Sequence, residues 1–239
     1  MTQNYYEATG VLVLDHVTPV IRTLFGIFSL RETFDGMRED EAYIAQKNPP
    51  NKVLWGELLE PLAHLAKRLR CPIPSNGNID MQTCLDVLST HFQVDHSHLD
   101  ELIARYNPTH RIYLDDLFLL ATCFDDGHAL TEIKATGAWC CSEPRLFEFG
   151  GDGIYICHEM ALYTSSTSAL ELGHTLRAAL NRGNICDAAN GLAATVESLF
   201  LRGFRDDALR DTLRQALAFE LLSQSSSEGS STDGQARRH

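Results

Sequence analysis

Residues 139–158 read WCCSEPRLFEFGGDGIYICH and form the most informative stretch of the chain. Two alternating runs, 147–149 and 154–157, flank four residues of which three are glycine. A short glycine-rich link between alternating runs is typical of a β-hairpin. The pattern predicts two strands joined by a turn at 150–153, where glycine would supply the positive φ that such turns require.

The residues before this hairpin extend it into a sheet. Residues 129–140 mix β-branched and small side chains, with the expected strand positions Leu130, Ile133, Ala135 and Trp139. Such residues suit a pleated, half-buried surface. We therefore expect a small antiparallel sheet of three or four strands in the middle of the chain.

The sequence before the sheet reads mainly as helix. An apolar seam with spacings of three and four residues marks the strongest helix: Trp55, Leu58, Leu62, Leu65 and Leu69. Pro61 lies inside this seam and predicts a kink or a division into two abutting helices, because its ring displaces a backbone hydrogen bond. The apolar run 11–14 fits either a strand or the entry to a helix. Residues 112–124 favour a buried helix, with a strand as the alternative.

Three helices are predicted after the sheet. Ser168 and Glu171 fit a capping box, Gly183 ends the first helix, and Asp206 caps the third. The third helix carries leucines that we expect to point inward: Leu209, Leu213, Leu217 and Leu221. From Ser223 the chain has no large apolar side chain, and backbone ordering costs about 1–2 kcal/mol per residue. This composition predicts a disordered tail.

Together these patterns predict an α+β fold that is mostly helical, with a small three- or four-stranded antiparallel sheet in the middle and a disordered C-terminal tail. The expected organisation is a helical part over residues 1–110, the sheet with the C-terminal helices over 111–222, and the tail over 223–239. A chain of 239 residues has enough material for a buried core.

The charge of the chain is acidic and uneven. The net charge is −12, and residues 111–160 carry nine acidic and three basic residues, a net −6. Broad nucleic-acid and anionic-membrane surfaces need clustered lysine and arginine, so we expect neither. The first residues lack the basic and then apolar segments of a secretory signal peptide. No apolar run reaches the roughly 18 residues that a membrane-spanning helix needs. We expect a cytoplasmic protein with mostly reduced cysteines.

Metal-ligating residue types occur in three places, and none has a convincing spacing. Cys140, Cys141, Cys157 and His158 form two adjacent pairs, and strand neighbours point to opposite faces, so only two ligands would face a zinc ion. The run that contains His91, Asp95, His96 and His98 is interpreted as an interhelical loop with a helix cap. Glu171 and His174 have the spacing of a di-iron ligand pair, but a second such pair is missing. We therefore expect no metal or other cofactor.

Catalytic motifs are equally weak, so no catalytic residue is assigned. The sequence has no Gly-x-Ser-x-Gly motif, and residues 150–153 lack the following helix of a phosphate loop. The pairs Asp115-Asp116 and Asp125-Asp126 are interpreted as caps at turns and helix ends. An enzyme with a dispersed Cys/His/Glu site stays open as an alternative, and a pocket lined by His158, Glu159, Glu171 and His174 would favour it.

Three short segments carry a resemblance to a known group. Residues 115–120 (DDLFLL), 137–140 (GAWC) and 146–151 (LFEFGG) resemble uncharacterised accessory proteins of bacterial integrative conjugative elements and plasmids. The resemblance spans residues 114–158, about a fifth of the chain. It implies a bacterial, cytosolic context and a mobile-element role, and it carries over no functional residue.

The leading hypothesis is a non-enzymatic bacterial mobile-element accessory protein that acts by protein–protein binding. Trp139, Phe147, Phe149 and Tyr155 are the candidate binding residues, because they lie in the acidic middle segment and aromatic side chains are frequent interface anchors. A second hypothesis is an acidic inhibitor that mimics nucleic acid and blocks a host defence or DNA-binding protein. The partner itself is not identified by the sequence.

Overall fold

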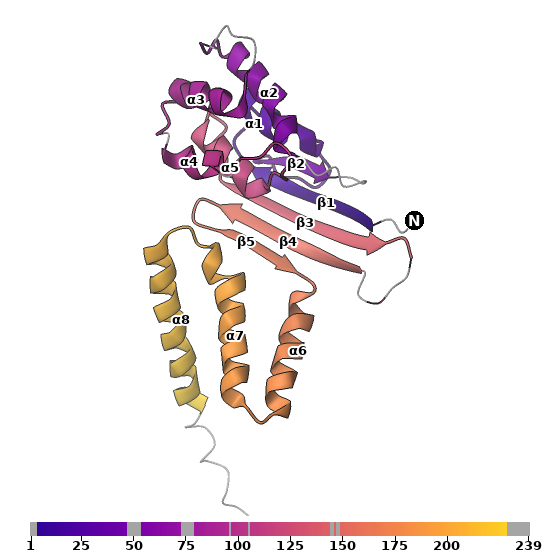
Figure 1. The fold of residues 1–239 in the computed structure, drawn as a ribbon, viewed down its shortest axis with the longest axis vertical. Helices are drawn as coiled ribbons and strands as arrows, with labels where there is room; N and C mark the ends of the chain where they lie inside the picture. Colours follow the sequence, from indigo (N-terminus) through magenta and orange to yellow (C-terminus); the bar gives the residue numbers. More distant parts are fainter. Residues whose placement is uncertain are drawn as a thin grey trace, which may run out of the picture. The chain divides into compact units, whose positions relative to one another are not determined.

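The protein consists of two compact units, Met1–Ser168 and Ala169–His239. The computed structural model describes residues 4–46, 54–72, 79–95, 97–104, 106–143, 146 and 149–228. Within the described residues, the first unit contains a sheet with helices and the second contains helices alone (Figure 1). Residue 110, where the sequence predicted a boundary, lies inside the first unit.

The centre of the first unit is a five-stranded antiparallel sheet with the strand order β2-β1-β3-β4-β5. Its strands are β1 (Asn4–Val13), β2 (Glu41–Gln46), β3 (Glu132–Cys141), β4 (Phe149–Cys157) and β5 (Ala161–Ser165). The predicted α+β fold with an antiparallel sheet is confirmed, but the expected number of three or four strands is wrong. The two additional strands, β1 and β2, come from the N-terminal part that was predicted to be helical.

Strand β1 escaped prediction because small residues fill its helix-facing side. Leu12 is fully buried opposite Ile133 of β3, whereas the next position on the same face, Gly10, lies opposite Ala135. Ala8 follows opposite Gly137. A strand is mainly recognised in a sequence by the alternation of large apolar and polar side chains. Among Ala8, Gly10 and Leu12 only Leu12 is a large aliphatic residue, so the alternation is too weak to indicate a strand.

The helices of the first unit gather on one side of the sheet (Figure 1). They are α1 (Pro19–Phe25), α2 (Trp55–Arg68), α3 (Met81–Phe92), α4 (Ser97–Ala104) and α5 (Leu114–Cys123), with the short 3-10 helix η1 (Gly26–Phe28) after α1. Their buried faces join Leu12, Ile133 and Ile156 of the sheet in one hydrophobic cluster. The predicted buried helix over 112–124 is confirmed by α5. At Pro61 the sequence predicted a kink or two abutting helices, and the second of these is wrong, because α2 continues through this residue as one helix.

The glycines at 150–153 belong to strand β4, so the predicted turn at this place is wrong. They pair with β3 from Gly150 opposite Trp139 to Gly153 opposite Thr136. Among the described glycines, positive φ occurs at Gly36, Gly127 and Gly183. At position 150 the missing side chain of glycine leaves room for the Trp139 indole, because a Cβ atom there would overlap its Cε2 and Cζ2 atoms. Glycine covered by a cross-strand aromatic ring is a known device of antiparallel sheets.

We expect Gly150→Ala to lower the free energy of unfolding by about 1–3 kcal/mol, because the added methyl group displaces the indole ring. Gly153→Ala is the matched control on the same strand, since its Cβ would meet only the Thr164 hydroxyl at 3.2 Å. Urea unfolding of both variants measures the difference. Equal losses for the two variants would contradict this explanation.

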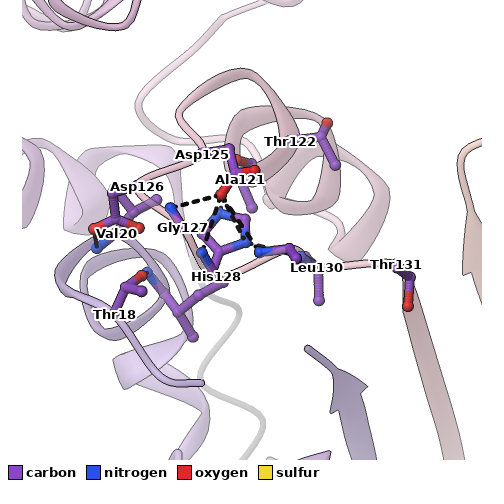
Figure 2. A network of polar contacts seen from close by, with 12 residues as sticks. Thr18, Val20, Ala121, Thr122, Asp125, Asp126, Gly127, His128, Leu130 and Thr131 are labelled. Carbon is purple, nitrogen blue, oxygen red and sulfur yellow. Dashed lines mark hydrogen bonds and ion pairs between the residues drawn. The ribbon is translucent and has the colours of Figure 1, made fainter. Parts of the chain in front are cut away.

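The segment between α5 and β3 is a hydrogen-bonded loop built around a buried histidine (Figure 2). Asp125 Oδ1 accepts the backbone N–H groups of Gly127 at 2.9 Å and His128 at 3.0 Å. The His128 ring, only 1% exposed, bonds through Nε2 to the Ala121 carbonyl at 3.1 Å and accepts the Leu130 N–H at Nδ1 at 2.9 Å. These bonds tie the end of α5 to the start of β3.

The second unit consists of helices α6 (Ser168–Asn181), α7 (Ile185–Leu199) and α8 (Asp207–Glu228), with the 3-10 helix η2 (Leu201–Gly203) before α8. Figure 1 shows α7 between α6 and α8. Gly183, with φ of +67°, follows α6, and Asp206 Oδ1 accepts the Leu209 N–H at 2.8 Å, so both predicted helix boundaries are confirmed. The predicted tail from Ser223 is wrong for residues 223–228, which are helical, and 229–239 lie outside the described residues.

The leucines of α8 are less buried than predicted, since Leu213 is half-buried and the other three are exposed. Leu209 is 37% exposed, Leu217 38% and Leu221 61%. Among the described residues of the second unit, the buried apolar side chains are Ala179, Ala188 and Leu201. The seam on α8 is therefore regular in sequence but only partly covered in the structure, because three helices in a row leave much of each helix open.

Candidate functional site

The face of the sheet turned away from α1–α5, called here the outer face, is a surface of the first unit that these helices leave uncovered. Alternation along the strands places Thr9, Thr136 and Thr164 at its centre, and all three are exposed. The helix-facing side, by contrast, is the base of the hydrophobic core. An antiparallel sheet with one free face is a common architecture, so the free face becomes informative only through the side chains it carries.

A groove of ≈ 560 Å³ crosses the outer face and is called the outer groove. Its principal side chains are Thr9, Val11, Tyr43, Thr136, Tyr155 and Leu162. They come from all five strands, so pairing of the whole sheet is needed to form the groove. The described residues that line it include no cysteine, histidine or carboxylate. The groove therefore offers apolar contacts, hydroxyl groups and the ammonium group of Lys134.

Two tyrosines of the groove are held by their neighbours. Tyr43 stacks on Phe34 with ring centroids 4.1 Å apart, and the Arg31 guanidinium lies over the same Phe34 ring. Partial burial, followed by the Glu132 carboxylate, raises the pKa of Tyr155. The Tyr155 phenol thus stays protonated and keeps its hydroxyl as a donor.

Acidic residues predominate around the groove. The strand residues of the outer face include Glu7, Glu41 and Glu132 but only one base, Lys134. Lys134 is already paired, with Nζ 2.6 Å from Glu132 Oε2. The first unit as a whole carries 23 acidic and 12 basic residues, a net −11. A partner with basic residues would thus meet a favourable field.

The structure describes three of the four aromatic residues that the sequence singled out, and it does not bring these three together. Tyr155 lines the outer groove. Phe149 lies on the same face and is 63% exposed, but six residues of extended strand place it about 20 Å away. Trp139 lies on the opposite face and covers Gly150. Phe147 lies outside the described residues. The four residues therefore do not form one patch.

Sequence reasoning missed three apolar members of the groove, Val11, Tyr43 and Leu162. Val11 lies in the run that fitted either a strand or a helix, and Tyr43 lies in a strand that was not predicted. Tyr43 alternates with buried Ala42 and Ile44, and this period of two residues was the available signal. No short-range pattern could indicate that these strands pair with β3 and β4.

The helix-facing side of the sheet carries a closed polar pair, Tyr6 and Asp152. The Tyr6 hydroxyl donates to the Asp152 carboxylate, at 3.2 Å to Oδ1 and 3.1 Å to Oδ2, and the pair passes over Gly137. Partial burial, with the charge of Asp152, raises the pKa of Tyr6 to about 12, against an opposing effect of Arg111. A phenol held protonated in this way is a poor general base near neutral pH.

A small cavity of ≈ 60 Å³ borders the Tyr6 side chain. Its lining is mainly apolar, with Ile112 and Ile154 among its walls, while Arg111 and Tyr113 also contribute. Pockets that hold drug-sized ligands or cofactors are roughly 300–1,000 Å³. This cavity is too small for such a ligand and is interpreted as a packing gap between the sheet and the start of α5.

The candidate metal residues do not converge. Cys140 lies opposite Phe149 at one end of β3, and Cys157 lies opposite Glu132 at the other, about 27 Å away along the strand. The Cys157 thiol donates to Glu159 at 3.1 Å, while the His158 ring packs against Phe118. Within the described part of the chain, no group of three His, Cys, Asp or Glu side chains could hold a metal ion.

The remaining candidates are divided among different places. His96 and the side chain of His98 fall outside what the structure describes, whereas His91 packs edge-on against Phe92. The four residues of the dispersed enzyme site belong to different units. His158 and Glu159 lie in the first unit, and Glu171 and His174 lie in the second.

The paired carboxylates have the predicted capping roles. Asp116 Oδ2 accepts the Tyr113 N–H at the start of α5, and Asp126 Oδ2 accepts the Val20 N–H at the start of α1. Asp115 instead lies near Tyr163, and partial burial together with this carboxylate raises the pKa of Tyr163 well above its ordinary value. Asp115, Asp116 and Asp126 therefore each interact with a neighbouring group of the fold.

No protein-family model matches the chain, and no curated protein or solved structure is detectably similar to it. Across the described residues, no helix combines the length and the apolar character that crossing a membrane requires.

Proposed function

We propose that this chain is a non-enzymatic accessory protein that binds a protein partner through the outer groove. The observation that carries the proposal is an uncovered groove of ≈ 560 Å³ in which Tyr43 and Tyr155 accompany Val11 and Leu162. Tyrosine is enriched at protein interfaces because it joins a large apolar body to a hydroxyl group. The bacterial mobile-element context of the proposal rests on the resemblance in residues 114–158.

The partner that fits this surface presents apolar side chains flanked by lysine or arginine. The apolar contacts follow from the lining of the groove, and the basic residues follow from the net −11 of the first unit. Electrostatic attraction of this kind raises the association rate and falls with salt. Binding should therefore weaken as ionic strength rises.

The alternative of a nucleic-acid mimic receives less support from the outer face. A mimic needs a regular series of carboxylates, whereas the centre of this face carries Thr9, Thr136 and Thr164. The enzyme alternative receives less support from the groove, because its lining contains no cysteine, histidine or carboxylate and its one amine, Lys134, is paired with Glu132. Protein binding is the function that its side chains favour.

Site-specific photocrosslinking tests the proposal in cells that produce the protein. With benzoylphenylalanine in place of Thr136, at the centre of the groove, we expect a discrete adduct with a basic protein. Tyr155→Ser should weaken binding to the protein so identified about fivefold or more, because a buried tyrosine anchor is typically worth over 1 kcal/mol. Titration calorimetry with that protein measures the change.

Tyr5 provides the matched control. It lies on the outer face, is 39% exposed, and does not line the groove. Benzoylphenylalanine at Tyr5 should not give the Thr136 adduct, and Tyr5→Ser should leave the affinity unchanged. No adduct from Thr136, or the same adduct from both positions, would contradict binding through the groove.

A further inference from the structure

Helix α7 carries an apolar stripe that consists of exposed Ile185 and Leu192 and half-buried Val196. Residues seven and four positions apart share one side of a helix, so the three side chains lie in a row. Ile185 is 67% exposed and Leu192 is 48% exposed. The opposite side of α7 carries Ala194 and Ser198, which are small and exposed. The helix is therefore amphipathic, but its apolar side is open.

The neighbouring helices do not cover this stripe. Helix α6 approaches α7 at Gly191, where an added Cβ would lie 3.2 Å from Thr175 Cγ2. Helix α8 is joined to another side of α7 by Arg214, whose Nη2 lies 2.8 Å from Glu197 Oε1. Positions 191 and 197 lie on either side of the stripe around the helix, so the stripe faces away from both contacts.

The second unit has little core of its own. Its buried apolar residues in the described part are two alanines and one leucine. Large apolar side chains that remain exposed on its helices include Leu180, Ile185, Leu192, Leu209, Leu217 and Phe219. An apolar surface of this extent on a soluble protein marks an interaction site.

We propose that the stripe is covered by the same stripe of a second copy of this chain. The second unit carries nine acidic and eight basic residues, a net −1, whereas the first unit carries −11. Self-association through the second unit thus brings together nearly neutral surfaces, while contact between first units would oppose like charges. The apolar stripe in this nearly neutral unit favours a partner surface that is also neutral and apolar.

The size and form of the surface also suit a two-fold interface. In such an interface each copy contributes the same patch, and a stable one buries roughly 800 Å² per partner from about 20–30 residues. In the proposed dimer the stripe forms the centre of the interface, and further residues of the second unit supply the remaining area. The inference concerns the second unit and is independent of the partner proposed for the outer groove.

Light scattering coupled to size exclusion tests the proposal on the full chain over a wide range of concentration. The wild type should have twice the chain mass of 26.6 kDa. The double variant Ile185→Gln with Leu192→Gln should have the mass of one chain and an unchanged helical circular dichroism signal. The matched control, Ala194→Gln with Ser198→Gln on the opposite side of α7, should stay dimeric. A monomeric wild type at every concentration, or a dimeric stripe variant, would overturn the proposal.

A second measurement covers the case in which the double variant fails to fold. Benzoylphenylalanine in place of Leu192 should form a covalent dimer of the chain on illumination of the purified protein, and the same residue at Ala194 should not. Equal dimer yields from the two positions, or no dimer from Leu192, would overturn self-association through the stripe.

Discussion

Gly10→Ala is expected to lower the free energy of unfolding by about 3 kcal/mol. A Cβ atom at position 10 would overlap the Lys134 carbonyl oxygen and lie 2.8 Å from Ala135 Cβ. Both obstacles belong to β3, which is paired with β1 on one side and β4 on the other. The sheet cannot move away from the added methyl group without losing pairing on one of these sides.

Urea unfolding followed by circular dichroism measures this loss. Gly26→Ala is the matched control, because a Cβ atom there would meet nothing within 4 Å and the backbone is helical at φ −58°. The control should be neutral or slightly stabilising, since alanine restricts the unfolded chain. A Gly10→Ala variant as stable as the control would show that β1 does not lie against β3 as described.

His128→Ala should lower the free energy of unfolding by a similar amount, about 2–4 kcal/mol. The change leaves a cavity and removes the partners of two buried backbone groups, the Ala121 carbonyl and the Leu130 N–H. The tautomer with its proton on Nε2 satisfies both bonds, because Nδ1 is then free to accept. The ring therefore acts as a bridge between α5 and β3 (Figure 2).

A conservative variant distinguishes the contribution of the His128 hydrogen bonds from that of the volume of its ring. In His128→Asn the amide oxygen can take the place of Nδ1 and accept the Leu130 N–H, so we expect about half of the loss to be recovered. The exposed His16 provides a control, and His16→Ala should change the unfolding free energy by less than about 0.5 kcal/mol. Equal losses for the alanine and asparagine variants would contradict the role of the hydrogen bond to Leu130.

The proposed site illustrates which residues a sequence can and cannot assign. Tyr155 was predicted as a binding residue and lines the outer groove, but Trp139 was predicted on the same grounds and lies on the opposite face. Aromatic character alone does not distinguish a ring that anchors a partner from one that covers a glycine. That distinction depends on the strand opposite, which is fixed only when β3 pairs with β4.

Local sequence patterns were enough to predict the mixed α+β class, the buried helix α5, the strand β3 and the helix boundaries at Gly183 and Asp206. These features depend on periodicity, capping and glycine geometry, which act within a few residues. Tertiary structure alone decided that β1 lies in the middle of the sheet, that residues 150–153 are strand, and that the leucines of α8 remain partly exposed. Each of these outcomes depends on a neighbour distant in sequence. Small residues such as Gly10 and Gly150 carry no apolar signal, yet they permit the close approach of β3 and of the Trp139 ring. The burial of a leucine likewise depends on how the helices pack together. A regular row of leucines in the sequence shows which side of a helix is apolar, but it does not show what covers that side.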